Sequence, residues 1–551
     1  MRSALLVLFF MVTAITHAQT ANWQWVKSAG RYDSHDKAYA VAVDPNGNSY
    51  VTGEFQDSID FGSYTLVNNG TYNSIMYITK YDPQGNVIWA KTMGGSNESV
   101  GKDICTDAGG NFYITGNFHG SIDFGGTTFN TSNLGSMFVA KFDSSGNALW
   151  AHNATCFWSN EGRGIALDPE GNVFVAGIFE DSTLNFGSGI SIQSVFSSDC
   201  FLAKYDNNGN ILWAIGGGGS AADLCNDVAV DKSGNAYVTG EFRTSMLFGN
   251  ITLTANNSGA ASAFVIKVDP TGNVLWGKNA GLYPSSGTGN SISVDGFGNS
   301  YATGFFNSPI IIFQNDTLYN AGADDIYIVK YDSTGNVTWT KGIGGVNYDQ
   351  GKGIVSDYNG NIYVTGMFKL NVSFGTIHMT GTNGEIFVVE YDSSGTALWG
   401  LQSTGALNEL SNNIALDENN YVYIAGDFSS PYSTFGPITL TNSDQFLGSY
   451  DMLLAKINVS PVGVFENSLS QFKSTIFPNP VVDRATITFK NPLHKFHNLE
   501  IYSANGQLIR TVSKNRSEQF QFEKQGLNAG LYFFRITNEE NESSCGKIII
   551  E

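Results

Sequence analysis

Short apolar runs that alternate with polar turns make up most of the chain. Between residues 38 and 95 these runs are AVAVD, SYVTGEF, MYITKYD and VIWAK, which are rich in Val, Ile, Tyr, Phe and Thr. Runs of this kind, bounded by Gly, Asn, Asp and Pro, are typical of β-strands, and no window shows the 3.6-residue apolar recurrence of a helix. The pattern therefore predicts four β-strands in this segment.

The four-strand unit recurs seven times. The glycines of its TGxF-type run are Gly53, Gly116, Gly177, Gly240, Gly304, Gly366 and Gly426. Successive copies are therefore 60 to 64 residues apart. Four antiparallel strands repeated at this period are the signature of a propeller blade. The predicted fold class is all-β: a seven-bladed β-propeller of four-stranded antiparallel blades, followed by a small β-sandwich C-terminal domain.

Two turns of each unit share the pattern D-x-x-G-N, as at residues 44–48 and 82–86. The Asp side chain can accept hydrogen bonds from the backbone amides of such a turn, and Gly takes the left-handed position. We therefore expect tight hairpins between strands one and two and between strands three and four. The pattern departs at Thr396 and in residues 417–421, where the sequence is DENNY. These five-residue turns lack the alternating carboxylates and distal Glu of an EF-hand, so no calcium site is expected.

The fourth strand carries a recurrent tryptophan, and this series predicts how the ring closes. Its members are Trp89, Trp150, Trp213, Trp276, Trp339 and Trp399. The seventh copy stops near residue 458 without a fourth strand, whereas Trp25 precedes the first copy at the right spacing. We therefore expect the N-terminal strand around Trp25 to complete the last blade.

The third strand carries a recurrent lysine two residues before its turn Asp, except in copy six, where Glu390 replaces it. The lysines are Lys80, Lys141, Lys204, Lys267 and Lys330. A residue present in nearly every copy serves the blade itself, so we expect a snorkelled or paired side chain.

The repeats resemble the SBBP repeats of bacterial surface and secreted proteins. The resemblance rests on runs such as AVDPNGNSYVTGEF and FVAKFDSSGNALW, which recur in register over residues 22–458. It implies a seven-bladed β-propeller and little about activity.

Both ends of the chain differ from the repeats. Residues 1–18 combine Arg2, an apolar core and the small-residue site Thr16-His17-Ala18, which predicts a secretory signal peptide. The propeller then spans residues 19–458, a linker residues 459–474 and a C-terminal domain residues 475–551. No other segment is apolar enough to cross a membrane, and a formal net charge of −20 argues against nucleic acid or an anionic membrane as partner.

The C-terminal domain resembles the type A sorting domain of the type IX secretion system of Bacteroidetes. The order of FPNP, IYSANGQ, LNAGLYFFRI and a terminal GKIIIE carries the resemblance. The motif residues are Phe477, Pro478, Asn479, Pro480, Gly506, Gly530 and Tyr532. The resemblance implies the type IX machinery as partner, export across the outer membrane, and a secreted or cell-surface location.

Five cysteines in an exported protein leave at least one without an intramolecular disulfide. Cys156 precedes strand one of blade three and Cys200 begins strand three of the same blade, so both are placed toward one rim. We predict a Cys156–Cys200 bridge, with Cys225 as the rival partner.

Catalytic motifs are absent from the sequence: it contains no HExxH, GxSxG or CxxC, and its seven His do not cluster with carboxylates. We expect no cofactor, no metal and no enzymatic activity. The favoured function is a surface or secreted binding and adhesion protein for a protein or glycan ligand. A hydrolytic, for example carbohydrate-active, enzyme with an axial active site and a structural surface-layer component are the alternatives.

The loops between strands two and three, and between one blade and the next, vary, whereas the D-x-x-G-N turns on the other face do not. Trp158 and Trp23 are the two tryptophans outside the strand-four series. Because exposed aromatic rings stack on sugars and anchor protein contacts, we predict a binding site at Trp158 and Phe157, with Tyr283 and Tyr348 as secondary positions. Trp158 folding back to plug the top of the channel or to cover a blade seam is the alternative.

Overall fold

The structure is a computed structural model that describes residues 19–550 except positions 33, 69–73, 94, 96, 133, 181–182, 196, 256–258, 282–285, 445–447, 462–473, 492–493, 504–507 and 540–542. The predicted signal peptide lies outside the described residues. Within them, no helix is long and apolar enough to cross a membrane. One compact unit spans Thr20–Ser460 and a second begins at Pro461.

Seven antiparallel sheets built on one four-stranded plan make up the first unit among the described residues. In order from the first strand they are β2 (Lys37–Val43), β3 (Ser49–Phe55), β6 (Ile75–Tyr81) and β7 (Val87–Thr92); β8 (Ser99–Thr106), β9 (Phe112–Phe118), β12 (Ser136–Phe142) and β13 (Ala148–Asn153); β14 (Asn160–Leu167), β15 (Val173–Glu180), β18 (Ser198–Tyr205) and β19 (Ile211–Gly219); β20 (Leu224–Val230), β21 (Ala236–Arg243), β24 (Ala261–Val268) and β25 (Val274–Asn279); β26 (Gly287–Val294), β27 (Ser300–Phe306), β30 (Asp325–Tyr331) and β31 (Val337–Ile343); β32 (Gln350–Ser356), β33 (Ile362–Phe374), β34 (Ile377–Tyr391) and β35 (Ala397–Thr404); and β36 (Glu409–Leu416), β37 (Val422–Phe428), β40 (Asp451–Pro461) and β1 (Gln19–Ala29). We number these sheets as blades 1 to 7.

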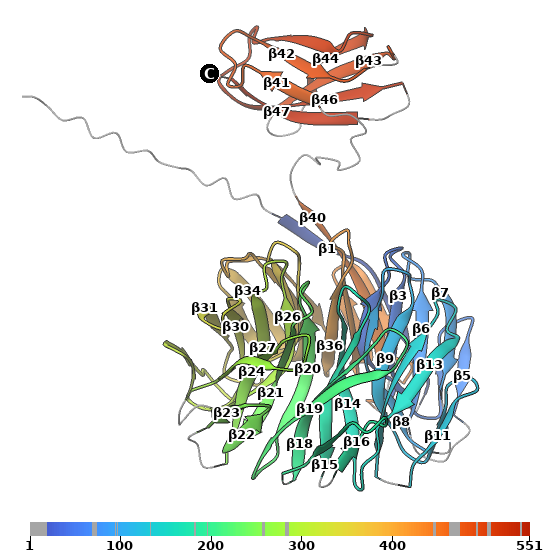
Figure 1. Cartoon of the computed structure of the whole chain (residues 1–551). Helices are drawn as coiled ribbons and strands as arrows, with labels where there is room; N and C mark the ends of the chain where they lie inside the picture. The colour runs from blue at the N-terminus through green and yellow to red at the C-terminus, as the bar shows by residue number, and fades with distance from the viewer. Residues whose placement is uncertain are drawn as a thin grey trace, which may run out of the picture. The chain divides into compact units, whose positions relative to one another are not determined.

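The first strands of the blades contact one another in a closed cycle. β2 packs against β8, β8 against β14, and so on through β20, β26, β32 and β36, which returns to β2. The blades therefore stand side by side around an axis (Figure 1). The predicted all-β architecture of four-stranded antiparallel sheets is confirmed.

The chain's first strand lies in its last blade. β1 is hydrogen-bonded to β40, so the outer strand of blade 7 comes from the N-terminal end of the described chain and the three inner strands from residues 409–461. The side chains of Trp23, Trp25 and Val26 on this strand are buried. β1 thus covers an edge that β40 would otherwise leave open.

Short hairpins occupy the connections between the second and third strands. They are β4 (Ser58–Asp60) with β5 (Thr65–Val67), β10 (Ser121–Asp123) with β11 (Thr128–Asn130), β16 (Thr183–Asn185) with β17 (Ser191–Gln193), β22 (Ser245–Phe248) with β23 (Ile251–Thr254), β28 (Ile310–Phe313) with β29 (Asp316–Tyr319), and β38 (Tyr432–Phe435) with β39 (Ile438–Thr441). In blade 6 the hairpin is continuous with β33 and β34. The sequence pattern did not predict these hairpins, because strands of three or four residues are too short to show alternation.

The core lies between the blades. Seven apolar clusters of buried side chains each take their members from two neighbouring blades. The cluster between blades 7 and 1, for example, joins Trp25 and Met452 to Val41 and Tyr77. A blade therefore buries its two faces only by contact with the blades on either side.

The D-x-x-G-N turns have the predicted geometry. In the first turn, Gly47 N donates to Asp44 O (2.8 Å), the Asp44 carboxylate accepts from Asn46 N (2.9 Å), and Gly47 has a φ of 78°. In the divergent turn DENNY, Asn420 takes the same position with a φ of 62°. Asn is among the few non-Gly residues that adopt this conformation readily, which explains why the turn tolerates the change.

The recurrent tryptophan and lysine tie each blade to a turn of the next blade. Trp89 Nε1 (3.3 Å) and Lys80 Nζ (3.2 Å) both donate to Ser144 O, and Lys80 Nζ lies 3.7 Å from the Asp44 carboxylate of its own blade. The corresponding tryptophan bonds are Trp25 to Pro83 O, Trp150 to Asn207 O, Trp213 to Pro270 O, Trp276 to Ser333 O and Trp339 to Ser393 O. The repeating lysine is thus a paired residue.

Blade 6 departs from this scheme, and the departure explains Glu390. The next blade has no turn between its third and fourth strands, because its fourth strand is β1. Trp399 Nε1 has no turn carbonyl to reach and donates to the carboxylate of Glu390 instead. Burial raises the pKa of Glu390 to about 7.

On the opposite face, four blade junctions hold a pair of buried carboxyl groups. One member lies in the loop-face part of the third strand of a blade, and the other lies at or just before the start of the first strand of the next blade. The pairs are Asp199 with Asp223, Asp325 with Asp349, Glu385 with Glu409, and Asp451 with Asp36. Burial, with a contribution from the partner's charge, raises the pKa of Asp36 and Glu409 to about 8 and that of Asp223 to about 7.

The second unit is a β-sandwich, as predicted. One sheet has the order β41 (Ser474–Phe477), β42 (Arg484–Phe489), β45 (Gln519–Glu523), and the other β44 (Leu508–Asn515), β43 (His497–Ser503), β46 (Gly530–Asn538), β47 (Ser543–Ile550). Side chains such as Ile487, Phe520, Ile501 and Phe534 form its buried core.

Ring closure gives the first prediction. Deleting residues 19–30 removes β1 with two buried tryptophans, and truncating a buried Trp costs about 3–5 kcal/mol. We expect a large fall in the melting temperature of the whole propeller, measured by differential scanning calorimetry. A deletion variant that melts at the wild-type temperature would refute closure through β1.

The carboxyl pairs predict an unusual pH dependence of stability. Because their pKa values are raised in the folded state, they stabilise the fold fully below about pH 4, and this contribution is lost as pH rises through about 6 to 8. Turn carboxylates act oppositely: hydrogen bonds from Asn273 and Thr271 lower the pKa of Asp269 to about 2 despite the opposing effect of burial. We expect the melting temperature to be highest at about pH 4 to 5.

Asp223→Asn should flatten the decline of the melting temperature between pH 5 and 8. The same substitution at the exposed Asp60 is the control and should leave the slope unchanged. A melting temperature that rises steadily from pH 5 to 8 in the wild type would contradict the prediction.

Candidate binding face of the propeller

The two faces of the propeller differ in how their polar groups are used. The D-x-x-G-N turns form one face, which we call the turn face; their carboxylates accept hydrogen bonds from their own turn amides, as Asp82 does from Gln84 N and Asn86 N. β40 ends and β1 begins at this face, since β40 holds the place of a third strand. The opposite face, which we call the loop face, carries the variable connections.

Phe157 and Trp158 form an exposed aromatic pair on the loop face. Phe157 is 72% exposed and Trp158 43%, and their rings meet edge to face at 5.5 Å. The backbone on both sides is fixed, by a bridge between Thr155 and Asn185 and by another between Ser159 and Gly135. Both side chains are thus among the exposed residues of the loop face, and the binding role of Trp158 stays a prediction.

Tyr348 is also on the loop face, in the connection that enters blade 6. It is 50% exposed, a bridge joins it to Asp324, and Lys369 Nζ lies 5.7 Å from the centre of its ring. The next residue, Asp349, is fully buried and accepts from the amides of Gly345 and Lys369. Tyr283 lies outside the described residues.

Each first strand carries one β-bulge, and the bulged residues form a ring that sequence reasoning missed. They are Tyr39, Lys102, Arg163, Asn226, Asn290, Lys352 and Asn412. Bonds run from one first strand to the next: Arg163 donates to Asn226 Oδ1 (2.8 Å) and Asn226 to Gly289 O (2.8 Å). The available signal was the change of residue type at one position of an otherwise regular repeat.

Charged groups cluster on one side of this ring. Glu161 lies 3.1 Å from both Lys102 Nζ and Arg163 Nε. Burial acts to raise the pKa of Glu161, but these two cations hold it below its usual value. In blade 7, burial raises the pKa of Asp427 to about 7, and the bulged residue Asn412 donates a hydrogen bond to this carboxyl group.

A cavity of about 350 Å³ opens between blades 4 and 5 at the loop-face end of the first strands. Arg243 NH2 lies 3.7 Å from Glu241, whose other carboxylate oxygen accepts from the Thr288 hydroxyl. Phe305 and Asn307 complete the wall. The cavity thus offers a cation, a carboxylate, an amide and an aromatic ring.

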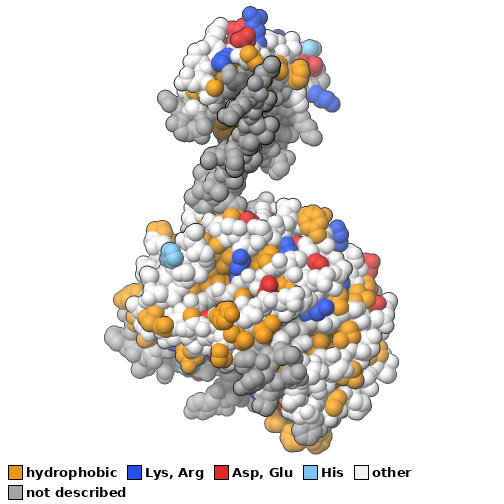
Figure 2. Space-filling view, turned by 90° about the vertical axis from the view of Figure 1, so that its left-hand side faces the viewer, with side chains coloured by type: hydrophobic (Ala, Val, Ile, Leu, Met, Phe, Trp, Pro, Cys, Tyr) orange, Lys and Arg blue, Asp and Glu red, His pale blue; other side chains and the backbone are white. Residues whose placement is uncertain are grey.

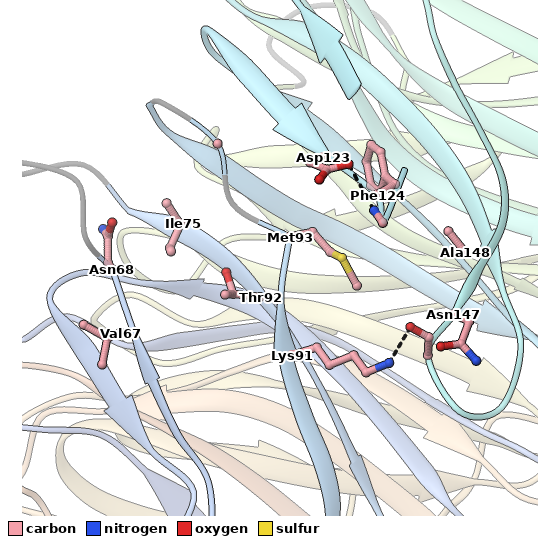
Figure 3. Close-up of a pocket in the computed structure, with 13 residues that line it drawn as sticks. Val67, Asn68, Ile75, Lys91, Thr92, Met93, Asp123, Phe124, Asn147 and Ala148 are labelled. Atoms are coloured by element: carbon pink, nitrogen blue, oxygen red, sulfur yellow. Dashed lines mark hydrogen bonds between the residues drawn. The ribbon is translucent and has the colours of Figure 1, made fainter. Parts of the chain in front are cut away.

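A larger cavity, about 810 Å³, lies between the outer parts of blades 1 and 2. In Figure 3, Lys91 extends toward the turn that contains Asn147, while Met93 and Phe124 lie on another wall. Lys91 Nζ donates to Ser145 O (2.8 Å) and Gly146 O (2.7 Å), and Asp123 accepts from the amide of Gly125. These charged groups are engaged by the fold itself.

The turn face has an aromatic pair of its own. Phe297 and Tyr358 are 63% and 64% exposed and lie 5.8 Å apart. Elsewhere, apolar side chains are scattered among polar ones on the visible side of the propeller, with few charged groups between them (Figure 2). The pair on the turn face is therefore the natural control for the pair on the loop face.

The predicted Cys156–Cys200 bridge is wrong. Cys156 lies in the cluster between blades 2 and 3 and accepts from Asn160 Nδ2 (3.2 Å), whereas Cys200 lies in the cluster between blades 3 and 4. The sheet of blade 3 separates them. Placement near one rim was not enough, because side chains that point to opposite faces of a sheet cannot meet.

The sorting-motif residues have identifiable roles in the C-terminal sandwich. Asn479 donates to Lys547 O (3.0 Å) and accepts from Ile549 N (2.8 Å), so it holds the terminal strand β47. Tyr532 OH donates to Asn528 O (3.1 Å), and Gly530 has a φ of 153°. Phe477, with Pro478 and Pro480 nearby, is exposed; Gly506 lies outside the described residues.

No group of three or more His, Cys, Asp or Glu side chains among the described residues is arranged to hold a metal ion. Asp103 and Asp227, two half-buried carboxyl groups on first strands, accept hydrogen bonds from backbone amides of neighbouring blades, Ile165 N (2.8 Å) and Ile292 N (2.9 Å). Their role is to join blades.

Comparisons with known proteins agree with this architecture. Residues 475–551 match the family described as secretion system C-terminal sorting domain. Residues 24–54, 215–241 and 338–367 match the beta-propeller repeat family SBBP. The sorting domain indicates export through the type IX secretion system to the cell surface or the medium.

Curated relatives are distant. An uncharacterized WD repeat-containing protein of Acanthamoeba polyphaga mimivirus is 27% identical, over 66% of this chain and 33% of its own. The regulatory protein FlaEY of Caulobacter vibrioides is 26% identical, over 52% of this chain and 32% of its own. The chain thus spans about a third of the length of these relatives.

Among solved structures, a protein of unknown function from Dyadobacter fermentans is similar with a TM-score of 0.35 and 12% identity, covering 80% of this chain and 99% of its own. That similarity is too low to support any assignment. The two family matches show that the chain carries SBBP-type beta-propeller repeats and a type IX secretion system C-terminal sorting domain.

Proposed function

We propose that this exported protein is a binding protein that recognises a protein or glycan ligand through the loop face of its propeller. The observation that carries the proposal is the exposed pair Phe157 and Trp158, in a loop whose backbone is bridged to neighbouring segments on both sides of the pair. Rigidly held aromatic rings supply large contact area at little cost in conformational entropy, and they dominate the energetics of many interfaces.

The charged cavity beside Glu241 and Arg243 supports recognition at the same face. Its polar groups would orient a ligand, while the aromatic pair would provide apolar contact. The last propeller strand in the sequence, β40, ends at the turn face, so the loop face does not carry the connection to the linker.

A hydrolytic function has weaker support. Catalytic carboxyl groups must be able to reach substrate, whereas the carboxyl pairs at the blade junctions are buried, and Asp223 and Asp349 accept hydrogen bonds from the backbone amides of Arg243 and Lys369. Glu241 is the carboxylate best placed at a cavity, but it is already paired with Arg243 and Thr288. We therefore place binding first.

The test is a pair of matched double variants of the mature protein. Immobilised polysaccharides and immobilised extracellular proteins first serve as probes to find a bound ligand. Phe157→Ala with Trp158→Ala should then weaken binding by about 2 kcal/mol, roughly 30-fold in Kd, as expected for an aromatic anchor.

Phe297→Ala with Tyr358→Ala removes the exposed aromatic pair of the turn face and should leave the affinity unchanged. Circular dichroism and melting curves check that both variants fold. Loss of binding only in the turn-face variant would show that the ligand binds the other side.

Processing gives a further prediction. Because the sorting domain serves export, a chain ending at residue 474 should accumulate inside the cell with its propeller folded. Surface protein from a host with an active type IX system should end before Phe477, measured by intact mass. Retention of Glu551 on that surface form would contradict this prediction.

A further inference from the structure

Cys200 and Cys225 meet inside the protein although they belong to different blades. Both side chains are fully buried, and both lie in the single apolar cluster between blades 3 and 4. They stand on β18 and β20, strands that contact each other across this junction. Burial, reinforced by contact with Cys225, raises the pKa of the Cys200 thiol well above its usual value.

The place of Cys225 is held by glycine in four other blades. These glycines are Gly101, Gly162, Gly289 and Gly351, each immediately before the bulged residue of its first strand. A Cβ on Gly101 would lie 2.1 Å from Thr52 Oγ1 of the preceding blade, and one on Gly351 2.3 Å from Thr303 Oγ1. A threonine thus excludes a side chain there.

The junction between blades 3 and 4 is altered on both sides. The blades that face these four glycines each have a threonine on their second strand. At the same position blade 3 has Ala176, which lacks the hydroxyl. The space that this leaves lies in the apolar cluster that holds Cys225. The junction between blades 7 and 1 also lacks this threonine and fills the space with Ala38 opposite Ala425. In blade 7 the place of Cys225 is taken by Ser411, and there the preceding blade keeps its threonine, Thr365.

Blade 3 also differs from the other blades at the position of Cys200 on the third strand. At the place of Cys200 the other blades have Met76, Met137, Ala263, Ile326, Ile386 and Met452. Met, Ile or Ala therefore fills this apolar position in the other blades. Blade 3 has cysteine at this place, and its partner across the junction, in the space that Ala176 leaves, is also a cysteine.

We propose that Cys200 and Cys225 form a disulfide bond that joins blade 3 to blade 4 in the exported protein. Export takes the chain out of the reducing cytoplasm. One thiolate attacks the disulfide of an extracytoplasmic thiol oxidoreductase, and the second thiolate displaces that enzyme from the mixed disulfide. The two cysteines lose two protons and two electrons, and the oxidoreductase is released as a dithiol.

The burial of both thiols sets the order of events. In the folded propeller neither sulfur is accessible to an oxidoreductase, and the raised pKa disfavours the thiolate that must attack. Oxidation therefore occurs while the chain folds after export, before the junction between blades 3 and 4 closes. Once formed, the bond is protected from reductants by the same burial.

Peptide mapping of the full mature protein tests the proposal directly. Protein from a type IX host is unfolded in N-ethylmaleimide without reductant, digested and analysed by mass spectrometry. We expect a cross-linked peptide pair containing Cys200 and Cys225, and maleimide on Cys105. Maleimide on both Cys200 and Cys225 would overturn the proposal.

Variants separate a covalent bond from simple packing. For the wild type and for Cys156→Ala, reductant present during unfolding should lower the melting temperature by several degrees. Cys200→Ala and Cys225→Ala should each melt lower than wild type and show no further effect of reductant. A wild type whose melting temperature is the same with and without reductant, although both single variants are destabilised, would show that the cysteines contribute packing alone.

Discussion

Contact between neighbouring blades is the interaction on which the rest of this structure depends. A four-stranded sheet with two apolar faces cannot bury either face alone, and each apolar cluster of the propeller is shared between two blades. The polar groups follow the same rule, since each strand-four tryptophan from Trp25 to Trp339 donates to a turn of the next blade. Closure by β1 therefore matters to every blade, because an open ring would leave two apolar faces exposed.

This dependence also separates structure from function along the sequence. Positions that join blades repeat, and their hydrogen bonds are used within the fold, as at the D-x-x-G-N turns. Positions free to differ collect in the loop-face connections and at the bulges around the axis. The exposed pair Phe157 and Trp158 and the charged group formed by Lys102, Glu161 and Arg163 belong to this second class. A rigid scaffold with variable loops is the usual arrangement for recognition.

Much of the fold could be predicted from the sequence, because the period, the turn residues and the tryptophan series are local patterns. The strand from Trp25 is a long-range pairing that was still predictable, since counting strands left one blade incomplete. The sequence offered Cys200 and Cys225 as possible bridge partners but could not place their side chains, because that depends on which face of a blade each one takes and on the small residue Ala176 in a neighbouring strand. The carboxyl pairs were missed because their members belong to different blades, 24 residues apart in three pairs and at opposite ends of the propeller sequence in Asp36 with Asp451.

Hydrogen exchange followed by mass spectrometry tests the closed ring most directly, because amide protection reports local opening. If β1 is part of the last blade, peptides covering residues 22–29 should be as strongly protected as those of β40 and of the outer strand β7. Protection of β1 and β40 should also be lost together as denaturant is added. Rapid exchange throughout residues 22–29 in a propeller that is otherwise protected would contradict the account.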